Sequence, residues 1–270
     1  MTNTSAAPTV GGFLAQGRAG ARPKRLAVLI FIAVFLAVWH ILSLHLPPFL
    51  LPGPGEIAAG LVDFLADARK VGHMLTSFRN VGLSIAISFF IGAALALLPY
   101  YLPVFRHTIH GRLGPFLNSF SGVGWTLLVI MWFGVSQVTV IFVICAVLIP
   151  FALINLHEGL RALDVELLEM SDSFTRSRWR QFWMVLVPAL YPFMFATLRI
   201  MFGVAWKVAL TAELFGGNAG LGYLINLARQ EFDTQTIFVS IILIIAFVYG
   251  TDRLVFGPIQ AKLSRAYATA

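Results

Sequence analysis

The chain has 270 residues, of which 59% are hydrophobic and 11% are charged, and its formal net charge is +7. Soluble domains usually carry about a quarter charged residues, so this composition excludes an ordinary soluble enzyme. It predicts an all-α, polytopic membrane helix bundle, with lipid rather than nucleic acid in contact with the basic residues.

The N-terminal residues 1–25 are rich in Gly, Ala, Ser and Thr and end in the basic stretch "RPKR". We expect a disordered tail there. The apolar run 26–46 is longer than a signal-peptide core, and no small-x-small cleavage site follows it. The run therefore predicts an uncleaved first membrane span.

The segment after this span begins with the proline-rich stretch "LPPFLLPGPGE", which cannot continue a helix. Apolar residues then recur at helical spacing over 57–71, at Ile57, Leu61, Phe64, Leu65, Ala68 and Val71. This pattern predicts one amphipathic helix that lies at the membrane interface or caps the bundle.

Five further apolar runs follow, and each approaches the roughly 20 residues that a helix needs to cross a bilayer. They cover 79–100, 116–135, 138–156, 188–213 and 235–256. Only "SQ" separates the third and fourth spans, which favours a hairpin. The expected organisation is a transmembrane domain over 26–256, followed by a C-terminal tail over 257–270.

Six crossings put both termini on one side of the membrane, and the basic residues select that side. With the N-terminus inside, most of the 19 Lys and Arg residues fall in cytoplasmic segments. The basic residues left outside are Arg69, Lys70, Arg79 and Arg229. We therefore expect cytoplasmic termini and a cytoplasmic loop over 157–187.

Catalytic and metal-binding patterns are missing from the sequence. "HEGLR" at 157–161 lacks the second His of a zinc helix, and no phosphate loop of the form G-x-x-x-x-G-K-[ST] occurs. Cys145 lies in an apolar run and is expected to be a small core residue. "GGNAGLG" at 216–222 is expected to be a flexible turn. We expect no catalytic, metal or cofactor site.

The loop over 157–187 carries five acidic residues and four arginines, together with apolar residues that an ordinary solvated loop does not need. One interpretation is an interfacial helix whose arginines meet anionic lipid. The other is a docking helix whose apolar side chains insert into the groove of a cytoplasmic partner.

This loop resembles the cytoplasmic coupling loop of ABC importer permeases, which has the pattern E-A-A-x-x-x-G followed by an apolar residue and L-P. The similar residues are Glu169-Met170-Ser171, Thr175 in place of the glycine, and Val185-Leu186-Val187-Pro188. "LPPFLLPGPGEI", "WFG", "LRIMFGVAWKVALTAELFG" and "GLGYLI" are similar to the nitrate/sulfonate/taurine/bicarbonate branch, in the same order, from about Pro47 to Arg253.

The resemblance implies a permease domain of the type I importer fold in a bacterial inner membrane. It implies a homodimer, two cytoplasmic ATP-binding subunits that hold the ATP, and an extracytoplasmic solute-binding protein. Nine residues would then contact the ATPase subunit: Glu166, Glu169, Met170, Ser171, Asp172, Phe174, Thr175, Arg176 and Arg178.

Ionisable residues inside a bilayer are costly and usually face an interior or a water-filled cavity. Lys207 is in the middle of the fifth run, and Arg199, Trp206 and Glu213 form one stripe of that helix. Arg199 and Glu213 can also snorkel or pair with neighbouring helices, and we favour this structural role for Glu213.

The hypothesis that follows is a pathway attractive to a small anion, lined by Ser119, Ser121, Trp125, Arg199, Trp206 and Lys207. Trp125 can equally be an aromatic of the membrane interface. The alternative function is a secondary transporter or channel without an ATPase, which predicts internal repeats; comparison of 26–135 with 138–256 finds no convincing one. A membrane enzyme is disfavoured by the missing catalytic residues.

Overall fold

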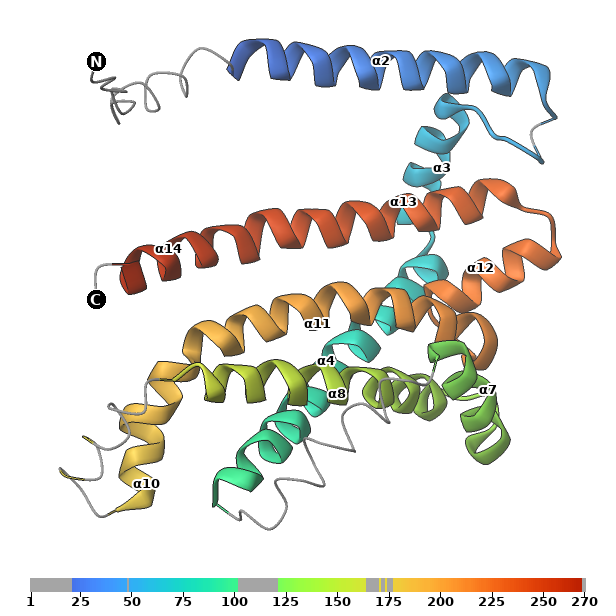
Figure 1. Cartoon of the computed structure of the whole chain (residues 1–270). Helices are drawn as coiled ribbons and strands as arrows, with labels where there is room; N and C mark the ends of the chain where they lie inside the picture. The colour runs from blue at the N-terminus through green and yellow to red at the C-terminus, as the bar shows by residue number, and fades with distance from the viewer. Residues whose placement is uncertain are drawn as a thin grey trace, which may run out of the picture. The chain divides into compact units, whose positions relative to one another are not determined.

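The computed structural model describes residues 21–47, 49–101, 121–163, 170, 173 and 177–268, and every regular element in these ranges is a helix. This confirms the predicted all-α membrane fold. The chain divides into two compact units, residues 1–59 and 60–270. Figure 1 shows the chain coloured from its N-terminus to its C-terminus.

The first unit contains the first predicted span. Helix α2 covers Ala21–His45 and is apolar enough to cross a membrane from residue 27 onward. Helix α2 therefore begins at Ala21, whereas the disordered tail was predicted to continue to residue 25. The loop after α2 is held by a 3.2 Å hydrogen bond from the indole Nε1 of Trp39 to the carbonyl of Pro52. Glu56 then accepts a 3.0 Å bond from the N–H of Gly53, which caps the start of the next helix.

The amphipathic helix predicted over 57–71 is two helices. Helix α3 covers Pro54–Ala66, and α4 begins after a break at Asp67 and covers Ala68–Tyr101. The Asp67 carboxylate accepts a 2.8 Å bond from the N–H of Arg69, and this bond holds the pKa of Asp67 below its usual range. Because Asp67 caps α4, the second span begins eleven residues earlier than the apolar run alone indicated.

Three long helices form the centre of the second unit. Helix α8 covers Gln137–Arg161 and α11 covers Val187–Gly216; they pack against each other, and α4 packs against both (Figure 1). Small residues permit the close approach. Gly92 of α4 faces Ala152 of α8 so closely that an added Cβ would collide with the alanine methyl group. Such small-residue contacts are typical of helix packing in membranes.

A row of small polar residues runs along the buried face of α4. Ser77, Asn80, Ser84 and Ser88 are each at most 1% exposed. Ser84 faces α8, since its hydroxyl donates to the carbonyl of Ile141 at 3.4 Å. Cys145 of α8 is buried beside it, with its thiol 3.7 Å from the Ser84 carbonyl, which confirms the prediction of a small core residue.

The third predicted span, 116–135, appears in the described residues as the shorter helix α7, Gly122–Phe133. It packs against α8 and α11. The connection to α8 consists of residues 134–136, in which Gly134 has a φ of 64° and Ser136 caps α8 by accepting a bond from the N–H of Thr139. The predicted short connection between the third and fourth runs is therefore present.

Two π-helical turns precede prolines in the last two spans. Helix α10, Arg178–Gln181, leads into the π turn η3, Phe182–Leu186, just before Pro188. Helix α13, Thr234–Thr251, leads into η4, Asp252–Phe256, and then into α14, Gly257–Ala268, which contains Pro258. Proline lacks an N–H and its ring crowds the preceding turn, so a widened turn lets each helix continue.

Five helical segments in the described residues are long and apolar enough to cross a membrane: Ala27–His45, Ala68–Pro99, Gln137–Arg161, Trp179–Gly216 and Thr234–Leu263. Helix α7 is shorter. Helix α12, Leu221–Gln230, connects α11 to α13 and contacts both, as well as α4. The fifth and sixth spans thus extend beyond the predicted runs, and the sixth includes part of the predicted C-terminal tail.

Candidate functional site

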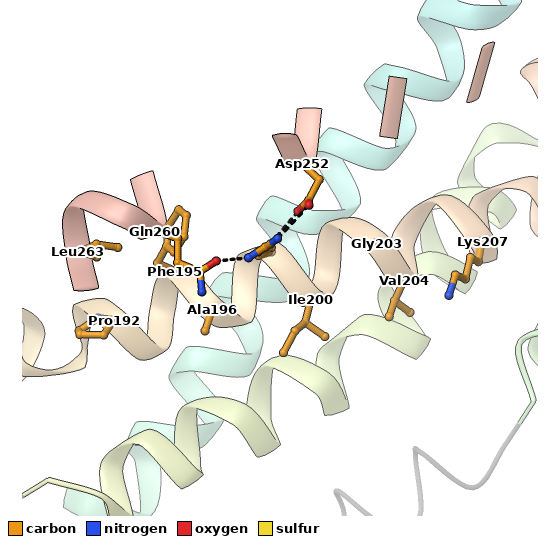
Figure 2. A pocket seen from close by; sticks show the side chains of 11 residues that line it. Pro192, Phe195, Ala196, Ile200, Gly203, Val204, Lys207, Asp252, Gln260 and Leu263 are labelled. Carbon is orange, nitrogen blue, oxygen red and sulfur yellow. Dashed lines mark hydrogen bonds and ion pairs between the residues drawn. The ribbon is translucent and has the colours of Figure 1, made fainter. Parts of the chain in front are cut away.

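A cavity of about 680 Å³ lies along one side of α11, where the end of the sixth span comes close to it. Figure 2 shows the lining of this cavity, which runs along α11 from Pro192 to Lys207 and includes Asp252, Gln260 and Leu263 from η4 and α14. Most of the lining is apolar, and it is formed by Pro192, Phe195, Ala196, Ile200, Gly203, Val204 and Leu263.

Arg199, one of the two predicted pathway cations, is in this cavity and is paired. Its Nε lies 2.7 Å from Oδ1 of Asp252, and its Nη2 lies 2.9 Å from Oδ2 of the same carboxylate. Its Nη1 also donates to the side-chain carbonyl of Gln260. A bidentate pair of this kind fixes the guanidinium and cancels its charge. Arg199 therefore connects α11 to η4 and adds little net charge to the cavity.

Lys207, the other predicted cation, lies at the far end of the same lining (Figure 2). Its side chain is exposed, and in the described part of the chain its ammonium group has no ion pair or hydrogen bond. Gly203, one turn earlier, leaves the adjacent surface open, because an added Cβ would meet nothing within 4 Å. Lys207 and Arg199 thus line the same cavity, and their role in a solute pathway stays a prediction.

Trp206 occupies a different face of α11 from the cavity. It is 3% exposed and packs edge-to-face against Phe78 of α4 and Phe247 of α13, with ring centroids 5.2 and 5.4 Å away. This aromatic cluster accounts for its burial. The structure therefore separates Trp206 from the cavity that Lys207 lines.

The pathway residues predicted on the third span are not in this cavity. Ser121 is exposed and precedes α7, and Trp125 is half-buried within that helix. Ser119 lies outside the described residues. The described residues that line the cavity come from α11, η4 and α14, so a pathway that includes Ser121 and Trp125 requires further surfaces.

Most of the predicted ATPase-contacting residues also lie outside the described residues: Glu166, Glu169, Ser171, Asp172, Phe174, Thr175 and Arg176. Met170 is helical and 55% exposed, and the backbone of Arg178 begins α10. The start of the loop, 157–161, is the last turn of α8, where Glu158 and Arg161 approach to 3.9 Å. The contact of this segment with an ATPase subunit stays a prediction.

Glu213, which was expected to pair with neighbouring helices, is completely buried at the end of α11. Its Oε2 accepts a 2.7 Å bond from the Ser77 hydroxyl and a 3.0 Å bond from the N–H of Gly222. Its Oε1 lies 3.3 Å from the amide nitrogen of Asn80. Buried carboxylates are costly unless they are hydrogen-bonded, and these three donors meet that requirement.

The stretch 216–222 is a fixed structure rather than the flexible turn that its glycines predicted. Gln137 donates to the side chain of Asn218 at 2.7 Å and to the carbonyl of Ala219 at 3.0 Å. The N–H of Gly220 donates to Nδ1 of His73 at 3.2 Å. Hydrogen bonds from helices distant in sequence therefore order a segment whose composition alone suggests flexibility.

Four polar residues of these two sites were missed by the sequence analysis. Asp252 lies near the end of the last apolar run, 235–256, and Gln260 follows it; neither position indicated a partner on α11. Ser77 and Asn80 belong to the row of polar residues on α4, and their helical spacing was a usable signal for a buried polar face. In the described residues, no group of three or more His, Cys, Asp or Glu side chains is arranged to hold a metal.

Comparison with known proteins assigns the chain to a family of membrane transport components. Residues 113–256, more than half of the chain, match the family described as "Binding-protein-dependent transport system inner membrane component". The chain is 29% identical over 232 residues to a Bacillus subtilis protein named as the aliphatic sulfonates transport permease SsuC, covering 84% of this chain and 83% of that one. It is 26% identical to the taurine transport system permease TauC of Escherichia coli, over 80% and 82% of the two chains.

The fold is also similar to that of a solved transporter. A chain of a bacterial alginate ABC transporter, solved in complex with its alginate-bound periplasmic protein, superimposes with a TM-score of 0.58 at 16% identity. The similarity covers 88% of this chain and 98% of that one. The helices therefore have the arrangement of an ABC importer permease, and the chain belongs to the family of binding-protein-dependent transport system inner membrane components.

Proposed function

We propose that the chain is the membrane-spanning subunit of an ATP-driven importer for a small organic anion, and that Lys207 attracts this anion. The observation that carries the proposal is an exposed ammonium group within a membrane span, on a cavity wall, without a partner among the described residues. Arg199 in the same cavity is already neutralised by Asp252.

An unpaired lysine in a span needs a compensating environment. Placing Lys at the centre of a membrane helix costs about 2.5–3.5 kcal/mol on insertion scales, and more if it faces hydrocarbon. A water-filled pathway removes most of this cost, and an anion in transit offsets the charge for the time it is bound. The open surface beside Gly203 supplies space for both.

The apolar lining of the cavity favours an organic over an inorganic anion. Side chains such as Phe195, Ile200 and Val204 offer no hydrogen bonds that could replace the hydration shell of an inorganic anion. An anion with a hydrocarbon portion buries that portion against them while its charged group meets Lys207. Aliphatic sulfonates, named for one of the relatives above, have this chemistry.

Features of the chain support the remaining parts of the proposed transporter. A second copy of the chain would close the pathway on the exposed side of Lys207. The two ATP-binding subunits would contact the segment around Met170, which is exposed. The excess of basic residues around this segment and the termini supports a cytoplasmic location for them, with the chain in a bacterial inner membrane. An extracytoplasmic binding protein would then deliver the solute to the opposite face.

Reconstitution tests the proposal directly. The chain, its cognate ATPase subunits and its binding protein are placed in lipid nanodiscs, and ATP hydrolysis is measured with taurine, alkanesulfonates, nitrate and bicarbonate. We expect stimulation by an organic anion and none by nitrate or bicarbonate. Stimulation by nitrate alone contradicts the organic-anion assignment. Solute uptake into proteoliposomes without ATPase subunits contradicts the importer assignment and supports a secondary transporter or channel.

A further inference from the structure

The N-terminus of α12 has no capping side chain of its own. Its N-cap residue is Gly220, with a φ of 121°. The first N–H groups of a helix have no partner within the helix and need acceptors from elsewhere. Here the acceptors come from two other helices: the N–H of Leu221 donates to the Ser77 hydroxyl at 2.7 Å, and that of Gly222 donates to Glu213 at 3.0 Å.

Glu213 and Ser77 therefore cap α12 in place of a local side chain. The Glu213 carboxylate also benefits from the partial positive charge at a helix N-terminus. Glycine at 220 and 222 is required by this arrangement, since a Cβ at Gly220 would collide with the carboxylate and one at Gly222 would lie 2.7 Å from Cβ of Glu213. The contacts are too close for α12 to shift against α11 without breaking them.

These hydrogen bonds join α12 to two membrane-spanning helices, and a third membrane-spanning helix bonds the residues just before α12. Ser77 and Asn80 belong to α4, Glu213 belongs to α11, and Gln137 of α8 accepts a 2.6 Å bond from Asn80 while it holds the carbonyl of Ala219. Glu213 is six residues from Lys207 on α11, about 9 Å along the helix axis. A displacement of α12 would therefore also displace the segment of α11 that carries Lys207.

We infer that Glu213 is a positioning residue that makes α12 a rigid extension of α11, so that a load applied to α12 by the solute-carrying binding protein moves the Lys207 segment. This inference rests on the proposed function, which places α12 on the extracytoplasmic side. Coupling between sites is carried by rigid elements held in discrete arrangements. Hydrogen bonds from α4 and α11 to α12, and from α8 to the connection before it, make α12 such an element.

The test compares two matched serine variants in the reconstituted complex. Ser77→Ala removes the hydroxyl that bonds both Leu221 and Glu213. Ser84→Ala is the control, because Ser84 is equally buried on the same face of α4 but bonds Ile141. Solute-loaded binding protein is titrated, and the maximal stimulation of ATP hydrolysis over its level without binding protein is measured. We expect Ser77→Ala to lower this maximum by about fivefold or more at an unchanged half-saturating concentration.

Other outcomes separate the inference from the function on which it rests. No stimulation of the native complex would contradict the proposed function. Stimulation of the native complex with equal maxima for Ser77→Ala and Ser84→Ala overturns the inference alone. A raised half-saturating concentration with a preserved maximum also overturns it, because that result describes weaker docking rather than lost coupling. Ser77→Thr keeps the hydroxyl, and we expect it to restore the maximum.

A spectroscopic measurement tests whether these hydrogen bonds restrain the motion of α12. A nitroxide label is attached at Gln230→Cys, an exposed position on α12, in a Cys145→Ala background. We expect greater label mobility with Ser77→Ala than with Ser84→Ala, and unchanged mobility would overturn the inference. If Ser77→Ala does not assemble, Glu213→Gln takes its place in both measurements, because it retains the side-chain shape and removes one acceptor.

Discussion

The N–H of Gly222 donates a 3.0 Å hydrogen bond to the carboxylate of Glu213, a residue nine positions earlier that belongs to another helix. This bond joins the end of the fifth span to the start of α12 and holds the connection between them in a fixed conformation. It also brings a completely buried carboxylate to the N-terminus of a helix, where three donors and the helix dipole stabilise it. This arrangement also requires glycine at positions 220 and 222, because a Cβ at either position would collide with Glu213.

Replacement of Gly220 by alanine should destabilise the protein. Its φ of 121° is unfavourable for other residues, and the added methyl group would collide with the Glu213 carboxylate. We expect a loss of about 2–4 kcal/mol, seen as a lowered midpoint of thermal unfolding of the purified complex. Gly72→Ala is the control. Gly72 lies in α4 with open space around it, so alanine there should be neutral or slightly stabilising.

Lys207→Met should abolish the attraction of the pathway for anions. We expect solute uptake to fall by about tenfold or more, because a hydrogen bond between charged groups is worth about 1.5–3 kcal/mol. Lys207→Arg keeps the charge and should retain most uptake. The measurement is uptake of labelled solute by proteoliposomes at several salt concentrations. Normal uptake by Lys207→Met with unchanged salt dependence would remove Lys207 from the pathway.

The Arg199–Asp252 pair should behave as a unit. Arg199→Met and Asp252→Asn each leave one charge without its partner, so each should lower thermal stability, whereas the double variant should lose less than the sum. We expect a coupling energy of about 1 kcal/mol, modest because both side chains are more than a third exposed. Strict additivity in this double-mutant cycle would show that the pair does not connect α11 to η4 in solution.

Gly203→Phe should obstruct the cavity without disturbing the fold. An added Cβ at Gly203 meets nothing within 4 Å, and the phenyl ring would project beside Lys207. We expect solute uptake to be lost while the complex still assembles and its thermal midpoint is retained. Gly82→Phe is the matched control, since Gly82 is also a helical glycine with open space around it, on α4. Equal uptake by the two variants would place the pathway elsewhere.

Replacement of residues 169–174 by alanine and serine should release the ATPase subunit. In this segment Met170 is exposed, and apolar side chains of this kind insert into a partner's groove. We expect the ATPase subunit to be absent when the variant permease is purified through an affinity tag, with the permease itself at its normal yield. Undiminished copurification would instead favour the interpretation in which the arginines of this loop contact lipid.

Composition and periodicity were sufficient to predict the membrane fold. Apolar runs near the length of a bilayer must form helices, since lipid offers the backbone no hydrogen bonds, and this physical constraint does not depend on tertiary contacts. The same reasoning predicted a pathway role for Lys207, because a lysine in the middle of such a run is costly wherever the helix packs. The prediction of one helix over 57–71 was wrong because Asp67, a local capping residue, interrupts an otherwise regular apolar pattern.

Only the tertiary structure decided which polar residues meet. Ser77 and Asn80 are 136 and 133 residues away from Glu213, and Asp252 is 53 residues away from Arg199. Helical periodicity places a side chain on a face of its own helix but does not specify which helix that face contacts. For this reason the sequence determined the spans and the membrane environment, whereas packing of the spans decided that Arg199 is neutralised, that Trp206 is buried and that Glu213 caps α12.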